Sequence, residues 1–193
     1  MTDKALILAR GLGTRMRKDD QSVALSEAEA RAAATGVKAM IPIDRPFLDY
    51  VLSALADAGY RKVCLVVAPD HEVIRRYYRE ESPPQRLTID FAVQEVPRGT
   101  ADAVAAGEAF AHGDDILVVN SDNYYPLEAL RQLRQVSGSA VALFEQEAML
   151  RESNIAPERI KAFAVGLADE DGNLVRILEK PDEKTLASLP RPL

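Results

Sequence analysis

The chain is 193 residues long, with 47% hydrophobic and 28% charged residues and a formal net charge of −6 at pH 7. This length and composition predict a globular protein of one domain, or two at most, with enough residues to bury a core. Because the balance is acidic and no basic cluster is present, nucleic acid and anionic membranes are not expected as partners of its surface.

Predicted strands and helices alternate over the first two thirds of the chain. Apolar runs and apolar–polar alternation predict strands at 4–9, 62–68, 87–94 and 115–120, and a short extended segment at 38–43. Helical spacing and helix-forming residues predict helices at 25–34, 46–58, 71–80, 100–110 and 126–136. This alternation indicates an α/β protein with a parallel sheet covered by helices on both faces.

The last third of the chain has a different pattern. Strands are predicted at 140–144, 161–168 and 174–178, with a hairpin-like turn at 169–173 and a short helix at 182–188. Because strand follows strand here, we expect the sheet to be mixed in this part. No domain boundary is visible, so the sequence predicts a single domain over 1–193.

Cysteine usage and the N-terminus bear on the compartment. Cys64 is the only cysteine and lies in an apolar run, so we expect it in the core, with no disulfide framework and no cysteine-based metal site. The N-terminus leads straight into a predicted strand, without a recognisable signal peptide or membrane span. A cytoplasmic protein is therefore expected. His71 and His112 are predicted to be surface residues without a role.

A glycine-containing stretch, L-A-R-G-L-G-T-R at 8–15, follows the first strand. Gly11 and Gly13 let backbone N–H groups approach an anion closely, and the guanidinium of Arg15 matches phosphate oxygens. The third glycine of a dinucleotide fingerprint would fall at Met16, and no P-loop lysine follows. By itself the stretch fits a phosphate-binding loop and a plain strand-to-helix turn about equally.

Polar residues follow other predicted strands. In an open α/β sheet, ligands gather at the carboxyl ends of the strands, so these residues are candidates for a site. They are Gln94, Arg98, Gly99 and Thr100 after one strand, Asn120, Ser121, Asp122 and Asn123 after the next, and Glu179 and Lys180 after the last. Such a set suits a phosphorylated ligand and a hard divalent cation.

Five segments in fixed order carry a family resemblance. They are L-A-R-G-L-G-T-R-M-R, K-A-M-I-P-I, Q-E-V-P-R-G-T-A-D-A-V, N-S-D-N and L-E-K-P, and they extend over nearly the whole chain. Together they resemble the sugar-1-phosphate nucleotidylyltransferases, the NDP-sugar pyrophosphorylases, of the type that uses UTP or dTTP with glucose 1-phosphate. The resemblance implies a Rossmann-like three-layer nucleotidyltransferase fold with a mostly parallel mixed sheet. It also implies Mg²⁺ as cofactor and an NTP and a sugar 1-phosphate as substrates.

The resemblance also implies roles for residues that contact the nucleotide. Gly11, Gly13 and Thr14 match the loop that wraps the NTP phosphates, and Arg15 matches its catalytic arginine. Lys38 matches a second catalytic residue, the lysine that steadies the phosphates.

Further matches concern the base, the metal and the sugar. Gln94 and Gly99 match the pair that reads the base, and an amide that donates and accepts at once suits uracil or thymine. Asp122 matches a metal ligand. Glu179 matches the carboxylate that binds sugar hydroxyls, and Lys180 matches the lysine that holds the sugar phosphate.

Each of these residues also has an ordinary structural interpretation. Arg15 and Lys38 fit solvated surface cations, and Asp122 fits a turn-capping aspartate. Glu179 and Lys180 fit an exposed ion pair that contributes little to stability. The order of the five segments, rather than any single residue, favours the functional interpretation.

The chain departs from the family pattern at several positions. Residues 16–37 separate Arg15 from Lys38, more than is usual, so the predicted helix at 25–34 is interpreted as an insertion. Val37, Ser121 and Ala164 replace a usual proline and two usual glycines. Only residues 182–193 follow Pro181, whereas the family's second metal aspartate lies further on. We therefore expect the chain to lack the family's C-terminal part, to bind nucleotide and to turn over slowly or not at all.

Two other functions stay open at this point. The chain fits a non-catalytic module that binds a nucleotide or sugar phosphate. It also fits a nucleotidylyltransferase for another phosphorylated acceptor, such as phosphocholine or an alditol phosphate. ATP is not excluded as the nucleotide.

Overall fold

The computed structural model describes residues 1–11, 38–179 and 181–187. The chain divides into two compact units, Met1–Ala140 and Val141–Leu193. The helix predicted at 25–34 lies outside the described residues, and the single functional domain over 1–193 stays a prediction. Within the described part of the chain, no helix has both the length and the apolar content that a membrane span needs.

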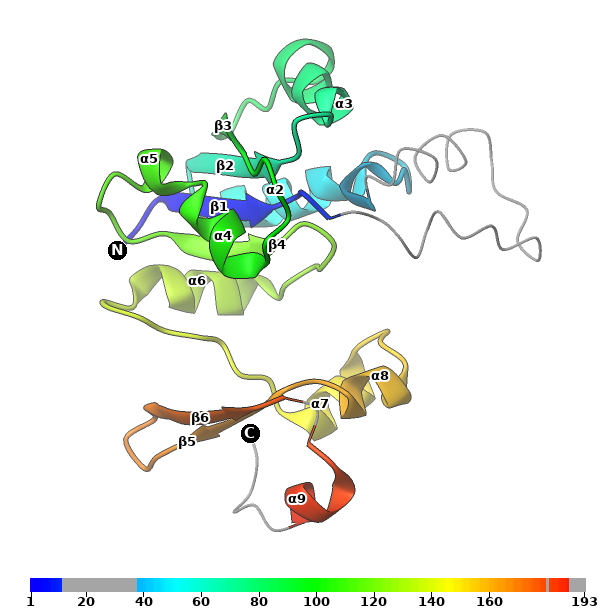
Figure 1. The fold of residues 1–193 in the computed structure, drawn as a ribbon, viewed down its shortest axis with the longest axis vertical. Helices are drawn as coiled ribbons and strands as arrows, with labels where there is room; N and C mark the ends of the chain where they lie inside the picture. Colours follow the sequence, from blue (N-terminus) through cyan, green and yellow to red (C-terminus); the bar gives the residue numbers. More distant parts are fainter. Residues whose placement is uncertain (12–37, 180, 188–193) are drawn as a thin grey trace, which may run out of the picture. The chain divides into compact units, whose positions relative to one another are not determined.

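A four-stranded parallel sheet forms the centre of the first unit (Figure 1). Its order is β3-β2-β1-β4, and its strands are β1 (Lys4–Leu8), β2 (Lys62–Val67), β3 (Thr88–Val93) and β4 (Leu117–Asn120). Leu6 of β1 is aligned with Cys64 on one side and Val118 on the other. The four strands predicted in this part are confirmed, and so is the α/β class.

One face of the sheet is covered by a helical layer. Its elements are α2 (Phe47–Ala58), α3 (Glu72–Arg76), η2 (Tyr77–Glu81) and α6 (Leu127–Gln135). Leu48 and Leu55 of α2 are fully buried and pack with Ile7 and Leu65 of the sheet. Gly59 ends α2 in the left-handed conformation, at φ 97°, as its position after the apolar spacing predicts.

The opposite face carries α4 (Thr100–Ala105) and α5 (Glu108–Ala111). Ala103 and Phe110 pack here against Leu6, Cys64 and Val66, which completes three layers. Burial raises the pKa of the Cys64 thiol to about 11, so it is a core residue, as expected, rather than a reactive thiol.

Two helices replace the single helix predicted at 100–110. The break occurs at Gly107, where a Cβ would lie 2.6 Å from Leu6 Cδ1. The chain here approaches the sheet so closely that only glycine leaves room for the Leu6 side chain. Sequence periodicity does not report such a contact, because it depends on the opposing strand.

The segment predicted as extended at 38–43 is different in the structure. It begins with a 3₁₀ helix, η1 (Lys38–Met40), and then turns into α2, with a backbone bridge between Pro42 and Pro46. Ala39 is buried by this turn. The prediction was wrong because none of the described strands pairs with this segment.

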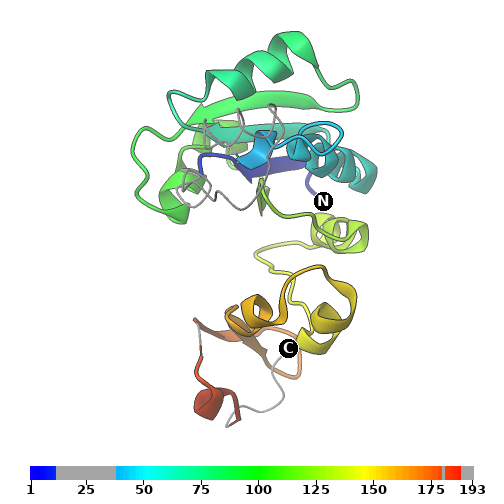
Figure 2. The same ribbon diagram turned by 90° about the vertical axis from the view of Figure 1, so that its right-hand side faces the viewer.

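The second unit contains α7 (Gln146–Glu152), α8 (Pro157–Lys161), β5 (Val165–Ala168), β6 (Leu174–Leu178) and α9 (Glu183–Ala187). Helices α7 and α8 lie side by side (Figure 2). Strands β5 and β6 are antiparallel and form a sheet of their own, so the expected mixed sheet is divided into a parallel and an antiparallel one. The turn between them is closed by Asn173 N–H, which donates to Asp169 Oδ1 at 2.7 Å.

Two of the strands predicted in the last third of the chain differ from the observed structure. Residues 140–144 are irregular rather than a strand, although they are apolar, and Leu143 packs against Gly166. The strand predicted to begin at Lys161 begins at Val165, because Pro157 starts a helix that extends to Lys161.

A substitution at Gly107 tests the close packing of α5 on the sheet. We expect Gly107→Ala to lower the free energy of unfolding by about 1–3 kcal/mol, because the added methyl group overpacks against Leu6. In a Leu6→Ala background the same substitution should cost clearly less, since the opposing side chain is gone. Urea denaturation of the four chains measures both values, and equal costs in the two backgrounds would contradict the contact.

Candidate functional site

The residues that follow the parallel strands are held together at one edge of the sheet. Backbone hydrogen bonds between neighbouring chain segments continue beyond the strands. Ala9 N–H donates to Val66 O at 2.9 Å, and Gln94 N–H donates to Val67 O at 3.0 Å. Ser121 N–H donates to Leu8 O at 3.3 Å. The chain leaving β1 is therefore aligned with the chains leaving β2 and β4. This is the edge at which α/β proteins bind their ligands.

Four of the sequence-predicted site residues lie in segments that leave this edge: Gly11, Gln94, Gly99 and Asp122. Lys38 is the first residue of η1. Glu179 is exposed and follows β6 in the second unit. Gly13, Thr14, Arg15 and Lys180 lie outside the described residues.

Gln94 is a buried amide with an ordered environment. Its side chain is 5% exposed, and Nε2 donates to Gly99 O at 3.1 Å and to Asp102 Oδ2 at 2.7 Å. The carboxamide therefore connects the end of β3 with the start of α4. A plain loop glutamine would be solvated, so this one has a specific structural position.

The two described glycines of the site have different local requirements. Gly99 has φ 118° and ψ −179°, a backbone conformation that only glycine adopts without strain. Gly11 is exposed, and a Cβ built on it would meet nothing within 4 Å. Backbone geometry thus requires glycine at Gly99, whereas at Gly11 a glycine keeps the backbone open to an approaching group.

Asp122 lies in the exposed turn that follows β4. Tyr125 organises this turn, because its hydroxyl accepts from Asn120 N–H and from Asn123 Nδ2, both at 3.3 Å. Among the described residues, no group of three or more His, Cys, Asp or Glu side chains could hold a metal ion. One protein carboxylate nevertheless suits Mg²⁺, which keeps several waters and takes its other ligands from substrate phosphates.

Arg10 is a residue of this edge that sequence reasoning did not assign. Its Nε donates to Gln94 O at 3.1 Å and its Nη2 to Glu95 O at 3.4 Å. The loop after β1 is thereby tied to the end of β3, across the end of β2. Its position inside the glycine-containing stretch is a signal in the sequence, but the resemblance assigns the catalytic role to Arg15.

His71 is buried, with 7% exposure, so the prediction of a surface histidine was wrong. It lies after β2, where Arg75 donates to Ala68 O and Pro69 O at 2.8 and 3.1 Å and folds the loop over it. Burial lowers the pKa of His71, and the nearby Arg10 and Arg75 lower it further. His112 is exposed, as predicted.

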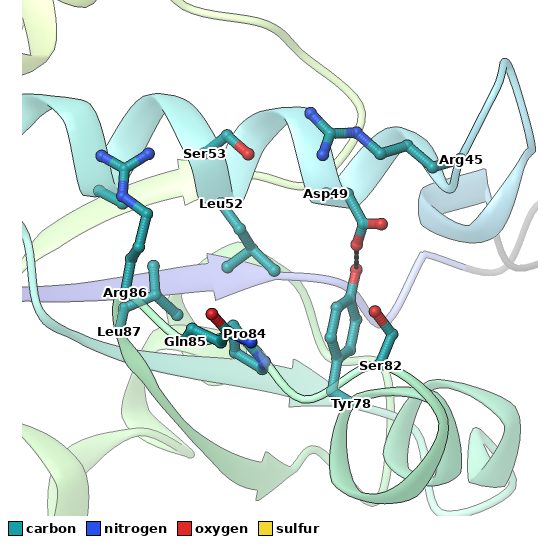
Figure 3. A pocket seen from close by; sticks show the side chains of 11 residues that line it. Arg45, Asp49, Leu52, Ser53, Tyr78, Ser82, Pro84, Gln85, Arg86 and Leu87 are labelled. Carbon is teal, nitrogen blue, oxygen red and sulfur yellow. Dashed lines mark hydrogen bonds between the residues drawn. The ribbon is translucent and has the colours of Figure 1, made fainter.

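A cavity of about 240 Å³ lies elsewhere, between α2 and the segment Tyr78–Leu87 (Figure 3). None of the predicted site residues that the structure describes lines it. Asp49 accepts from Tyr78 Oη at 2.8 Å and from Tyr77 Oη at 3.1 Å, and Arg86 is paired with Asp57. Asp49 and Arg86 are thus paired within the protein, and four of the described residues predicted for the site lie in segments that leave the sheet edge, which is the better candidate site.

The sequence matches the Nucleotidyl transferase family over residues 4–190. The chain belongs to this family. It is 29% identical to a glucose-1-phosphate thymidylyltransferase of Neisseria meningitidis serogroup A over 184 residues, which cover 92% of this chain and 56% of that protein. It is 28% identical to a D-glycero-alpha-D-manno-heptose 1-phosphate guanylyltransferase of Campylobacter jejuni over 126 residues, 65% of this chain and 50% of that protein.

A solved structure supports the fold of the family. UDP-glucose pyrophosphorylase complexed with UDP-glucose matches with a TM-score of 0.64 and 17% identity, over 95% of this chain and 71% of that one. The α/β nucleotidyltransferase fold expected from the sequence is confirmed. The chain spans about half the length of the curated relatives it matches. The bases in the names of these relatives differ.

The low pKa of His71 predicts a pH dependence of stability. In the folded chain the His71 imidazole binds a proton less readily than in the unfolded chain, where a histidine has a pKa of about 6.5. The contribution of neutral His71 is therefore complete above that pH and is lost as the pH falls below it. We expect the free energy of unfolding to fall less between pH 7.5 and 5 in His71→Gln than in the unaltered chain. Equal falls would contradict this effect of burial.

The backbone at Gly99 predicts a second stability effect. We expect Gly99→Ala to lower the free energy of unfolding by about 1–3 kcal/mol, because alanine is strained at that φ and ψ. Gly11→Ala is the matched control, since it has room for a Cβ and no positive φ, and its cost should stay below about 0.5 kcal/mol. Urea denaturation distinguishes the two. Similar costs would argue against the strained conformation.

Proposed function

We propose that this protein, with the rest of its polypeptide if it is part of a longer one, transfers a nucleotidyl group from an NTP to a sugar 1-phosphate. The convergence of Gly11, Gln94, Gly99 and Asp122 on the carboxyl edge of the sheet carries the proposal, together with membership of the family. The products are an NDP-sugar and pyrophosphate. The relatives named for thymidylyl and guanylyl transfer support this class of reaction.

The reaction is a displacement at phosphorus. A phosphate oxygen of the sugar 1-phosphate forms a bond to the α-phosphorus, and the bond from that phosphorus to the bridging oxygen breaks, so that pyrophosphate leaves with the electron pair. No protein nucleophile takes part. Catalysis then consists of positioning the two phosphates and neutralising their charge.

The proposed roles are those that the resemblance to the family implies for each residue. The open backbone at Gly11, with Gly13 and Thr14, wraps the triphosphate, while Arg15 and Lys38 neutralise charge on the transferring group. Gln94 and Gly99 hold the base. Glu179 and Lys180 hold the sugar and its phosphate. These last two belong to the second unit.

Asp122 is the proposed protein ligand of Mg²⁺. When bound, this ion would neutralise charge on the phosphates of the NTP and orient them. The exposed carboxylate follows β4 directly, and the turn that carries it is held by Tyr125. Carboxylate oxygen is a preferred ligand of this cation.

A non-catalytic nucleotide-binding module is the second candidate. The small number of metal ligands favours it, because Asp122 is the single carboxylate assigned to Mg²⁺ in the described part of the chain. Both candidates require nucleotide binding, but only the first requires turnover. UTP and dTTP are the proposed nucleotides.

Thermal denaturation with NTPs tests both candidates. A bound ligand at about 100 times its Kd stabilises a protein by about 2.7 kcal/mol, which corresponds to roughly 5–10 °C in Tm for a chain of this size. We expect such a shift with UTP or dTTP and Mg²⁺. No shift with any of the common NTPs would contradict both candidates. Pyrophosphate release with glucose 1-phosphate, and with phosphocholine and an alditol phosphate as alternative acceptors, then separates enzyme from module.

A substitution at Asp122 tests the metal site. We expect Asp122→Asn to remove most of the Mg²⁺-dependent part of the Tm shift and to lower any turnover by about 100-fold or more, because a ligand charge is lost. Asp171→Asn is the control, as an exposed turn aspartate of the second unit. An unchanged Mg²⁺ dependence in Asp122→Asn would rule out this residue as the ligand.

A further inference from the structure

Both hydrogens of the Gln94 amide are used inside the protein. Nε2 carries two hydrogens, and it donates to two acceptors, Gly99 O at 3.1 Å and Asp102 Oδ2 at 2.7 Å. No described residue donates to Oε1. The side chain thus has no hydrogen left for a ligand, while its oxygen has no donor among the described residues.

The orientation of this amide follows from its partners. If the amide were turned over, Oε1 would face a carbonyl oxygen and a carboxylate oxygen, and neither has a proton to donate. Two hydrogen bonds would be replaced by two repulsive contacts, one of them with a charge, in a group that is 5% exposed. The carboxylate of Asp102 makes this preference stronger than a neutral acceptor would.

The backbone on both sides of this pair is also held. Gln94 N–H donates to Val67 O at 3.0 Å, and Arg10 Nε donates to Gln94 O at 3.1 Å. Asp102 lies on α4, where the neighbouring Ala103 is buried against the sheet. Neither residue can move away without breaking these contacts, so the orientation of the amide belongs to the fold.

We propose that Asp102 is a specificity-determining positioning residue, which holds Gln94 as a hydrogen-bond acceptor toward the base of the nucleotide. The proposal rests on the nucleotidyl transfer proposed above and names the class of base. A base that fits must bring an N–H to Oε1. This changes the reason for assigning Gln94 to the base, because the amide accepts only, rather than donating and accepting at once.

The bases divide into two classes at the ring nitrogen of their pairing edge. Uracil and thymine at N3 and guanine at N1 carry a hydrogen there, whereas cytosine at N3 and adenine at N1 present a lone pair. The lone pair would face Oε1 and repel it. Asp102 also polarises the amide and makes Oε1 a stronger acceptor. An Oε1 atom placed against this ring nitrogen therefore selects uracil, thymine or guanine.

Nucleotide affinities of three chains test the proposal. Isothermal titration with UTP, GTP, CTP and ATP, each with Mg²⁺, gives the Kd values for the unaltered chain, Asp102→Asn and Glu108→Gln. We expect the unaltered chain to bind UTP or GTP at least about 10-fold more tightly than CTP and ATP, as expected for a buried hydrogen-bonding site. In Asp102→Asn the asparagine Nδ2 can donate to Oε1, so the amide can turn over and the preference should fall about 10-fold.

The Glu108→Gln control distinguishes an effect of the Gln94 amide orientation from an effect of the lost negative charge. Glu108→Gln removes a negative charge from an exposed residue of α5, and it should leave the preference among bases unchanged. A preference that falls equally in both variants would contradict the positioning role, because charge alone would explain it. Loss of all nucleotide binding in a folded Asp102→Asn would also contradict it.

The outcomes distinguish this inference from the proposed function. If the unaltered chain binds no NTP, the proposed function fails and the inference fails with it. If it binds NTPs and Asp102→Asn keeps the same preference, only the inference fails.

A second measurement does not depend on the folding of any variant. N3-methyluridine triphosphate lacks the ring N–H, and the unaltered chain should bind it at least about 10-fold more weakly than UTP. Equal affinity for the two nucleotides would overturn the proposal.

Discussion

The burial of β1 is the constraint on which the rest of the structure depends. Ala5, Leu6 and Ile7 are fully buried, with Ile7 packed toward the α2 layer and Leu6 toward the α4 layer. The backbone of the same strand is paired on both sides, with β2 and β4. Burying a leucine or isoleucine side chain contributes about 1.5–3 kcal/mol to the free energy of unfolding. A one-residue shift of β1 would exchange its two faces, so its register is strongly specified.

The site is a consequence of that register. Because β1, β2 and β4 end in alignment, the chains that leave them continue to hydrogen-bond through Ala9 and Ser121. Arg10 then connects the chain that leaves β1 with the chain that leaves β3. The Nε2 group of Gln94 is satisfied by Gly99 and Asp102 within the protein, which leaves Oε1 as the atom proposed to contact the base. A few backbone hydrogen bonds thus connect the packed core with the residues proposed to bind the ligand.

Much of the fold could be predicted because its signals are local. The continuous apolar run of β2 and the helical spacing of α2, closed by Gly59, were interpreted correctly. The run at 140–144 shows the limit of such signals, because apolar residues become a strand only where another strand pairs with them. At 38–43 none of the described strands supplies such a partner either, and the chain turns instead.

The sequence by itself determined the alternation of strands and helices, the buried central strands and the order of the five segments that indicate the family. These depend on residue type and spacing along the chain. Only the tertiary structure decided the burial of His71, the break at Gly107 against Leu6 and the orientation of Gln94 toward Asp102. Each of these depends on which groups the folded chain brings together, because burial, close contacts and hydrogen bonds are set by distances in three dimensions and not by spacing along the chain.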